Sequence, residues 1–197
     1  MRPLAAPVIF QHMTYYGSKE LASAFRTVRK NTIQIAEEIP EDKYNFQPAP
    51  GTRTVARTLA HIAFLPSFNR SMGNRTSFPA DFDFAKFRAE MEAEEKKPRS
   101  KAEIVAWLRE SGEDFARWVE GLNEDSLAQV FTFPAGAQPP TRARFEMIQS
   151  VKEHEMHHRA QLMLVERMLG ITPHLTRQNE ERMAAMQKAQ QAQPAQA

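Results

Sequence analysis

Residues of the types that bind metal ions are concentrated in the segment VKEHEMHHRAQLML, which runs from Val151 to Leu164. Its letters HEMHH, beginning at His154, match the H-E-x-x-H pattern of zinc proteases, in which two histidines one helical turn apart bind the ion. The same residues equally suit two ligands of a different metal site, or polar positions on a buried helix. The short pattern alone does not choose among these three interpretations.

The helical phase of this segment separates its three histidines. At about 100° per residue, His154 and His158 fall within one apolar stripe, whereas His157 falls at its margin. The stripe consists of Met147, Val151, Leu162, Val165 and Leu169. Two inward imidazoles each need a polar partner, and one metal ion would satisfy both. The alternative is a pair of core histidines that hydrogen-bond to protein groups.

A further histidine strengthens the metal interpretation. His61 belongs to another helical segment, on a strip with Thr54, Thr58 and Phe68 that borders the main apolar face. Three histidines from two helices would give a set of nitrogen ligands that leaves coordination positions open. A carboxylate-bridged di-iron site is disfavoured, because the Glu and Glu-x-x-His residues that it needs on four helices are missing.

The zinc-protease alternative lacks its third ligand. The extended protease motif requires Gly at position 161 and His at position 164, where this chain has Gln161 and Leu164. Glu180 and Glu181 lie downstream in a polar tail. Glu155 falls on the far side of His158 from His154, so it either flanks a metal ion or forms a salt bridge at the edge of the bundle, and the salt bridge is favoured.

Four long segments with helical periodicity would position these residues. They span about residues 18–39, 52–66, 100–122 and 141–169. Pro66 is expected to kink or end the second segment, and Ser100 begins a capping box at the third. No strand alternation is evident, and the Pro- and Gly-rich stretch FTFPAGAQPPT is expected to be a loop, with or without a short extended piece. The class is therefore all-α.

The expected architecture is a four-helix bundle with a long crossover between its second and third helices. Residues 73–99 form this connection, with a short, mostly solvated helix in DFAKFRAEMEAEEKK. Residues 1–176 are expected to form a single helical bundle domain, and residues 177–197 a polar, low-complexity tail.

The composition of the chain limits the kinds of metal ligand and of partner that the protein can have. The chain has no cysteine, so any metal site is built from His, Asp and Glu, and any thiol chemistry needs an external thiol. The net charge of +2, without a basic stripe, does not indicate a nucleic-acid partner. No apolar run reaches the roughly 18 residues of a membrane span. We expect a cytoplasmic protein that contacts neither nucleic acid nor membrane.

Two motifs resemble the DinB/YfiT-like family of metal-dependent four-helix-bundle proteins. PAPGTRTVARTLAHIAF, from Pro48 to Phe64, is similar to that family's second-helix start and first histidine. HEMHHRAQLMLVERMLGITP, from His154 to Pro173, is similar to its H-x-x-x-H-R-[GA]-Q helix, with Ala160 at a position that is often Gly. The resemblance extends over about residues 18–175.

The resemblance implies a fold and a ligand set. It places the three metal ligands on His61, His154 and His158, and implies a divalent ion such as nickel or zinc and a homodimer. Characterised relatives in the wider superfamily include transferases and isomerases that use the low-molecular-weight thiols bacillithiol or mycothiol. The resemblance does not settle the reaction.

Two functions remain open. The first is a metalloenzyme acting on a small-molecule substrate, by thiol-dependent transfer or metal-assisted hydrolysis. Gln161 is expected beside the site, Arg159 at the surface, and Tyr44, Phe46 and Phe68 in packing rather than at a pocket mouth. The second is a non-catalytic, stress-related protein that binds a metal or ligand.

The number of protein ligands distinguishes these two functions, because a fourth protein ligand closes a structural site. His12 is not expected to reach it, and His174 is expected to be exposed. A metal-free helical interaction domain is a third possibility.

Overall fold

The computed structural model describes residues 16–192, and these are mostly helical. The four long bundle helices are α1 (Ser18–Glu38), α2 (Val55–Met72), α4 (Lys101–Glu120) and α6 (Arg144–Met168). The other elements are a 3-10 turn (Glu41–Lys43), α3 (Phe84–Lys96), α5 (Glu124–Ala128), β1 (Val130–Thr132), β2 (Thr141–Ala143) and α7 (His174–Ala192).

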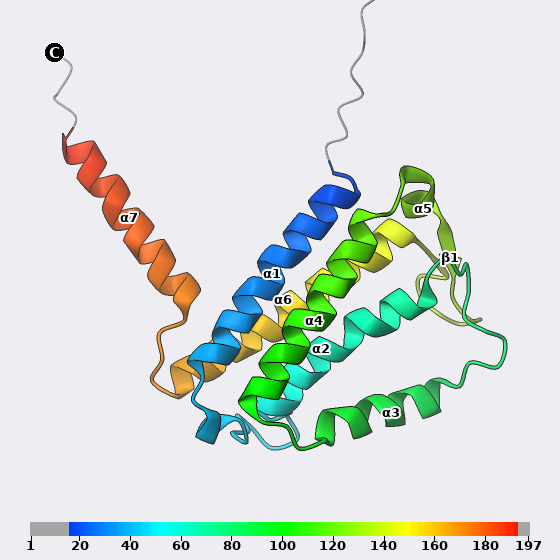
Figure 1. Cartoon of the computed structure of the whole chain (residues 1–197), viewed down its shortest axis with the longest axis horizontal. Helices are drawn as coiled ribbons and strands as arrows, with labels where there is room; N and C mark the ends of the chain where they lie inside the picture. The colour runs from blue at the N-terminus through cyan, green and yellow to red at the C-terminus, as the bar shows by residue number, and fades with distance from the viewer. Residues whose placement is uncertain (1–15, 193–197) are drawn as a thin grey trace, which may run out of the picture.

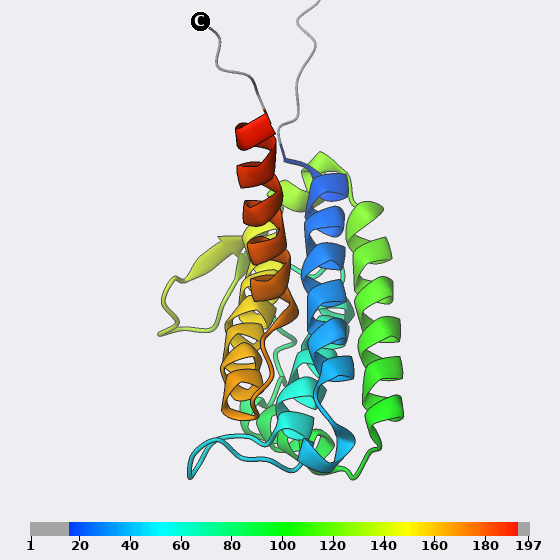
Figure 2. The same cartoon turned by 90° about the vertical axis from the view of Figure 1, so that its left-hand side faces the viewer.

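The bundle has the predicted crossover between α2 and α4. Both α1 and α2 pack against α4 and α6 (Figure 1). Helices α1 and α4 are antiparallel, since Arg26 bridges to Glu120 near one end and Arg109 to Glu37 near the other (Figure 2). Helices α2 and α4 run in the same direction (Figure 1). The segment that contains α3 returns the chain to the end at which α2 began.

The helix boundaries follow capping residues where the sequence has them. Thr54 caps α2 by accepting from Arg57 N, and Ser100 forms the predicted capping box with Glu103 at α4. Helix α6 begins at Arg144 rather than at residue 141, because Thr141–Ala143 pairs antiparallel with Val130–Thr132. The sequence left room for a short extended piece here but did not predict a hairpin, because strands of three residues are too short to show an alternating pattern.

Of the two outcomes expected at Pro66, a kink or an end, the helix does not end there, since α2 continues to Met72. Proline removes the N–H that would bond to the carbonyl four residues earlier, which is Ile62 O. That carbonyl accepts a hydrogen bond of 3.3 Å from Arg29 Nη2 instead. A side chain of α1 therefore supplies the donor that Pro66 lacks.

The same arginine joins all four helices at the centre of the bundle. Arg29 pairs with Glu155 of α6 at 2.9 Å and donates to Leu108 O of α4, and the side chains of the Arg29–Glu155 pair are 4% and 2% exposed. A Cβ on Gly112 would lie 2.7 Å from Arg29 Cγ, so only glycine leaves room for this side chain. Because a buried charge without its partner is strongly destabilising, this pair fixes the rotation of α6 about its axis.

Aromatic packing attaches the crossover segment to the bundle. Phe87 of α3 stacks on Phe68 of α2 at a centroid distance of 4.1 Å, and Phe78 packs edge-on against Phe131 of β1 at 5.1 Å. Phe82 lies between these two contacts. The contacts hold α3 beside α2, where it can reach the histidines.

Helix α7 leaves the bundle after Gly170 and is directed away from it (Figure 1). Its first residue is buried, whereas Met183 and Met186 are exposed. The predicted domain boundary between residues 176 and 177 falls inside this helix and stays a prediction. Over residues 16–192, no helix is both long enough and apolar enough to span a membrane.

Candidate metal centre

The three predicted histidines converge at the face between α2 and α6. His154 Nε2 lies 2.9 Å from His61 Nε2 and 3.1 Å from His158 Nε2. One nitrogen from each ring falls within 4.8 Å of the others, and in residues 16–192 this is the only such group of His, Asp or Glu side chains. His61 and His158 are buried and His154 is half-buried.

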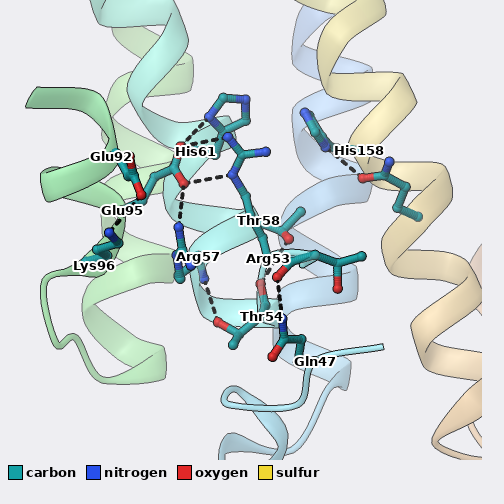
Figure 3. Close-up of polar contacts among 12 residues, drawn as sticks. Gln47, Arg53, Thr54, Arg57, Thr58, His61, Glu92, Glu95, Lys96 and His158 are labelled. Carbon is teal, nitrogen blue, oxygen red and sulfur yellow. Dashed lines mark hydrogen bonds and ion pairs between the residues drawn. The ribbon is translucent and has the colours of Figure 1, made fainter. Parts of the chain in front are cut away.

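Neighbouring side chains orient two of the rings. His61 Nδ1 lies 2.7 Å from Glu95 Oε1 of α3, and His158 Nδ1 lies 2.8 Å from Gln161 Oε1 (Figure 3). A carboxylate only accepts, so His61 carries its proton on Nδ1 and keeps a lone pair on Nε2. The amide nitrogen of Gln161 donates to His157, so its amide oxygen is the atom that faces His158. This oxygen accepts a hydrogen bond, so His158 also carries its proton on Nδ1.

Burial and charge keep these groups in their metal-binding forms. Burial, followed by repulsion from the neighbouring imidazoles, lowers the pKa of His154 to about 3, and burial lowers the pKa of His158 to about 4. Burial acts to raise the pKa of Glu95, but hydrogen bonds from His61 and Arg53 outweigh it and hold that pKa at about 2. Near neutral pH the site therefore has two uncharged imidazoles beside an ionised carboxylate.

The three imidazole nitrogens are better suited to coordinate one metal ion than to hydrogen-bond to one another. His61 Nε2 and His158 Nε2 both present lone pairs to His154 Nε2, and one proton on that atom can satisfy only one of them. A single ion would accept all three lone pairs. Two nitrogens at about 2.1 Å from a tetrahedral zinc ion lie roughly 3.4 Å apart, close to the two separations in this cluster.

Glu95 is the site residue that the sequence did not reveal. Its side chain is 1% exposed and accepts from Arg53 Nε at 2.7 Å as well as from His61 (Figure 3). The prediction of a mostly solvated helix held for most of α3, but it missed this one inward position. Glu95 stands in the run EAEEKK, and nothing in that run distinguishes it from its exposed neighbours.

The other candidate residues have mixed outcomes. His157 is exposed, as predicted, and Gln161 contacts the site. The salt bridge predicted for Glu155 exists, but it lies at the bundle centre rather than at its edge. The expectation of an exposed His174 was wrong, because this residue is 1% exposed and faces Asn31 of α1.

The remaining candidates pack or lie elsewhere. Tyr44 is buried and donates to Ala36 O, Phe46 packs on the core, and Phe68 stacks on Phe87. Arg159 is half-buried rather than at the surface. His12 lies outside the described residues.

A pocket of about 780 Å³ opens beside the histidines. His158 of the cluster lines it, together with Glu95 and Gln161, which hold two of the imidazole rings. One wall comes from α3, the start of α2 and the loop before it, and the other from the last turns of α6. Its volume is within the range of small-molecule sites.

The fold and the histidine cluster together define a helical bundle with a candidate metal site, and comparison with known proteins identifies the family. Residues 24–162 match the DinB superfamily, and the chain belongs to it. It is 25% identical over 162 residues to YjoA of Bacillus subtilis, an uncharacterised protein, covering 79% of this chain and 92% of YjoA.

Solved structures show the same fold. YfiT from Bacillus subtilis, described as a probable metal-dependent hydrolase with an unusual four-helix bundle topology, matches with a TM-score of 0.61 and 16% identity, over 87% of this chain and 95% of YfiT. A DinB-like protein from Bacillus cereus matches with a TM-score of 0.60 and 17% identity, over 79% of this chain and 94% of that protein.

Proposed function

We propose that the protein is a divalent-metal-dependent enzyme in which His61, His154 and His158 hold one ion. The observation that carries the proposal is the convergence of three imidazole nitrogens, with two lone pairs facing a third nitrogen, beside a pocket that His158 lines. Within the described chain the cluster has no fourth His, Asp or Glu. A three-ligand site of this kind is typical of catalytic rather than structural ions.

Nickel and zinc suit imidazole ligands. A bound divalent ion would polarise a carbonyl and lower the pKa of water or of a thiol. The residues around it keep the ligands in place: Glu95 holds His61, Gln161 holds His158, and the Arg29–Glu155 pair fixes the rotation of α6. Glu95 stays ionised over the neutral range, so its role is to hold the imidazole rather than to move protons.

Two reactions fit this site. Metal-assisted hydrolysis is supported by the description of YfiT, which shares the fold. Thiol-dependent transfer would need a low-molecular-weight thiol, because the chain has no cysteine. A small-molecule substrate fits the pocket volume, and we keep a homodimer and a cytoplasmic location as part of the proposal.

Turnover by metal-loaded and metal-free protein tests this function. Protein loaded with zinc or nickel is assayed on activated esters and amides, and on a soluble electrophile with a low-molecular-weight thiol. We expect one of the two reactions to occur with the loaded protein and to be lost with His61→Ala. Metal binding without turnover in either assay would contradict the enzyme proposal and support the non-catalytic, metal-binding alternative.

A further inference from the structure

The two walls of the pocket differ in chemistry. Arg53, Arg57 and Arg88 line the wall formed by α3 and the start of α2. On the opposite wall, α6 presents two exposed apolar side chains one turn apart, Leu164 at 60% and Met168 at 51% exposure, above the buried Val165. Large apolar side chains gathered at a pocket entrance indicate contact with an apolar ligand group.

The three arginines of the basic wall carry more positive charge than Glu95, the one carboxylate in the described chain that pairs with them, can neutralise. Arg53 donates two hydrogen bonds to Glu95, so the charge of Arg53 is neutralised within the protein. Arg57 forms a longer ion pair with the same carboxylate, at 3.7 Å, without a hydrogen bond to it, and its buried Nε has no hydrogen-bond partner among the described residues. Arg88 is exposed and forms no ion pair within residues 16–192, whereas the nearby Glu92 is paired with Lys96.

The start of α2 does not supply a competing anion site. Val55 N donates to Phe46 O, Ala56 N to Tyr44 O, and Arg57 N to Thr54 Oγ1. These first amide groups of the helix are therefore occupied, and an anion in the pocket must be held by side chains. Arg57 and Arg88 are the donors that remain.

We infer that the pocket binds an amphipathic anion: a small organic molecule with an oxyanion group against Arg57 and Arg88, and a hydrocarbon portion along Leu164, Val165 and Met168. Guanidinium groups pair with carboxylates and phosphates alike, so the shared chemistry is the oxyanion. The inference deepens the proposed function by naming the substrate class, and it places the reacting part of that substrate between the two walls, beside His158.

Binding of simple probes to the full chain tests the inference. Octanoate is compared by calorimetry with butyrate, which is shorter, and with octanamide, which is neutral. We expect octanoate to bind at least about tenfold more tightly than butyrate, because each methylene that is fully buried is worth about fourfold. We also expect it to bind more tightly than octanamide, because only the carboxylate forms charge-assisted hydrogen bonds with the arginines. Equal affinity for octanoate and octanamide would overturn the assignment of a charged group.

Two pairs of variants locate the two ends of the ligand. Arg88→Gln should weaken octanoate binding roughly threefold to fivefold, whereas Lys86→Gln, the same charge change on α3 outside the pocket, should not. Leu164→Ser should weaken octanoate more than butyrate, and Met156→Ser, an exposed apolar position on α6 away from the pocket, should leave both unchanged. Equal effects within either pair would contradict the placement.

Metal removal distinguishes this inference from the proposed function. Protein treated with a chelator should still prefer octanoate over octanamide, because the arginines supply the charge. Loss of that preference without metal would overturn the arginine assignment and leave the metal site standing. Octyl phosphate completes the series: a preference for either oxyanion over octanamide supports the inference, and their order identifies carboxylate or phosphate.

Discussion

Glu95 connects the histidine cluster to the basic wall of the pocket. It accepts from His61 on one side and from Arg53 on the other, and it is almost fully buried. A carboxylate behind a ligating imidazole fixes the tautomer and makes the ligand more basic. The crossover helix α3 therefore contributes to the site although it carries no predicted ligand.

Glu95→Gln should weaken binding of a divalent ion by about 10- to 100-fold, the usual cost of losing such a partner. The reason is that glutamine keeps the shape of the side chain but removes the charge that fixes His61 Nδ1–H. Titration against a chromophoric chelator measures the affinity. Glu92→Gln is the matched control, because Glu92 lies one turn earlier on α3 and pairs with Lys96. Equal affinities for the two variants would show that Glu95 only packs.

At the scale of residues, the histidine cluster could be predicted, and the side chains that support it only in part. His154 and His158 lie one turn apart on an apolar stripe, and His61 lies on a strip that borders the apolar face of a second helix, so periodicity indicated all three. Glu95 and His174 were missed for a different reason. Their burial depends on where α3 and α7 pack, and neither helix has an apolar stripe strong enough to show which face turns inward.

At the scale of elements, the junction of α1, α6 and α7 holds a second group of buried titratable side chains. Glu166 of α6 is fully buried, and neither of its carboxylate oxygens has a hydrogen-bond partner within the described residues. Burial, followed by repulsion from Glu38, raises the pKa of Glu166 to about 7. His174 at the start of α7 also lies here, and burial lowers its pKa.

Glu166→Gln should gain stability relative to wild type as the pH rises from 5 to 8. The unfolded chain has already lost most of the Glu166 proton at pH 5, whereas the folded wild type holds it up to about pH 7. The wild type therefore loses stability across this window, and the variant does not. The shift from 4.5 to about 7 corresponds to roughly 2–3 kcal/mol across the window.

Urea unfolding of both proteins at pH 5 and pH 8 measures this difference. Glu180→Gln, at an exposed position on α7, should not change the pH dependence of stability. A constant difference between the wild type and Glu166→Gln at the two pH values would contradict the raised pKa.

The elements that could be predicted are those with long apolar stripes. Helices α1 and α4 lie close to their expected bounds, with Ser100 capping the latter. The continuation of α2 past Pro66 could not be predicted, because its donor, Arg29, comes from another helix. The hairpin of β1 and β2 was missed since its three-residue strands carry no periodic signal.

At the scale of the whole molecule, the crossover brings a third helix, α3, to the site formed by α2 and α6. It lets α2 and α4 run parallel, and it passes α3 along α2 so that Glu95 reaches His61. The length of residues 73–99 was sufficient to predict the crossover. The course of α7 was not predictable, because its polar sequence has only a short buried portion at His174.

Metal content of the purified, untagged protein tests the central claim most directly. Mass spectrometry is applied to the wild type, to His61→Ala and to His157→Ala, an exposed neighbour of the cluster. We predict about one equivalent of a divalent transition metal in the wild type and in His157→Ala, and none in His61→Ala. No metal in the wild type, even after reconstitution, or full metal retention by His61→Ala, would contradict a three-histidine metal site.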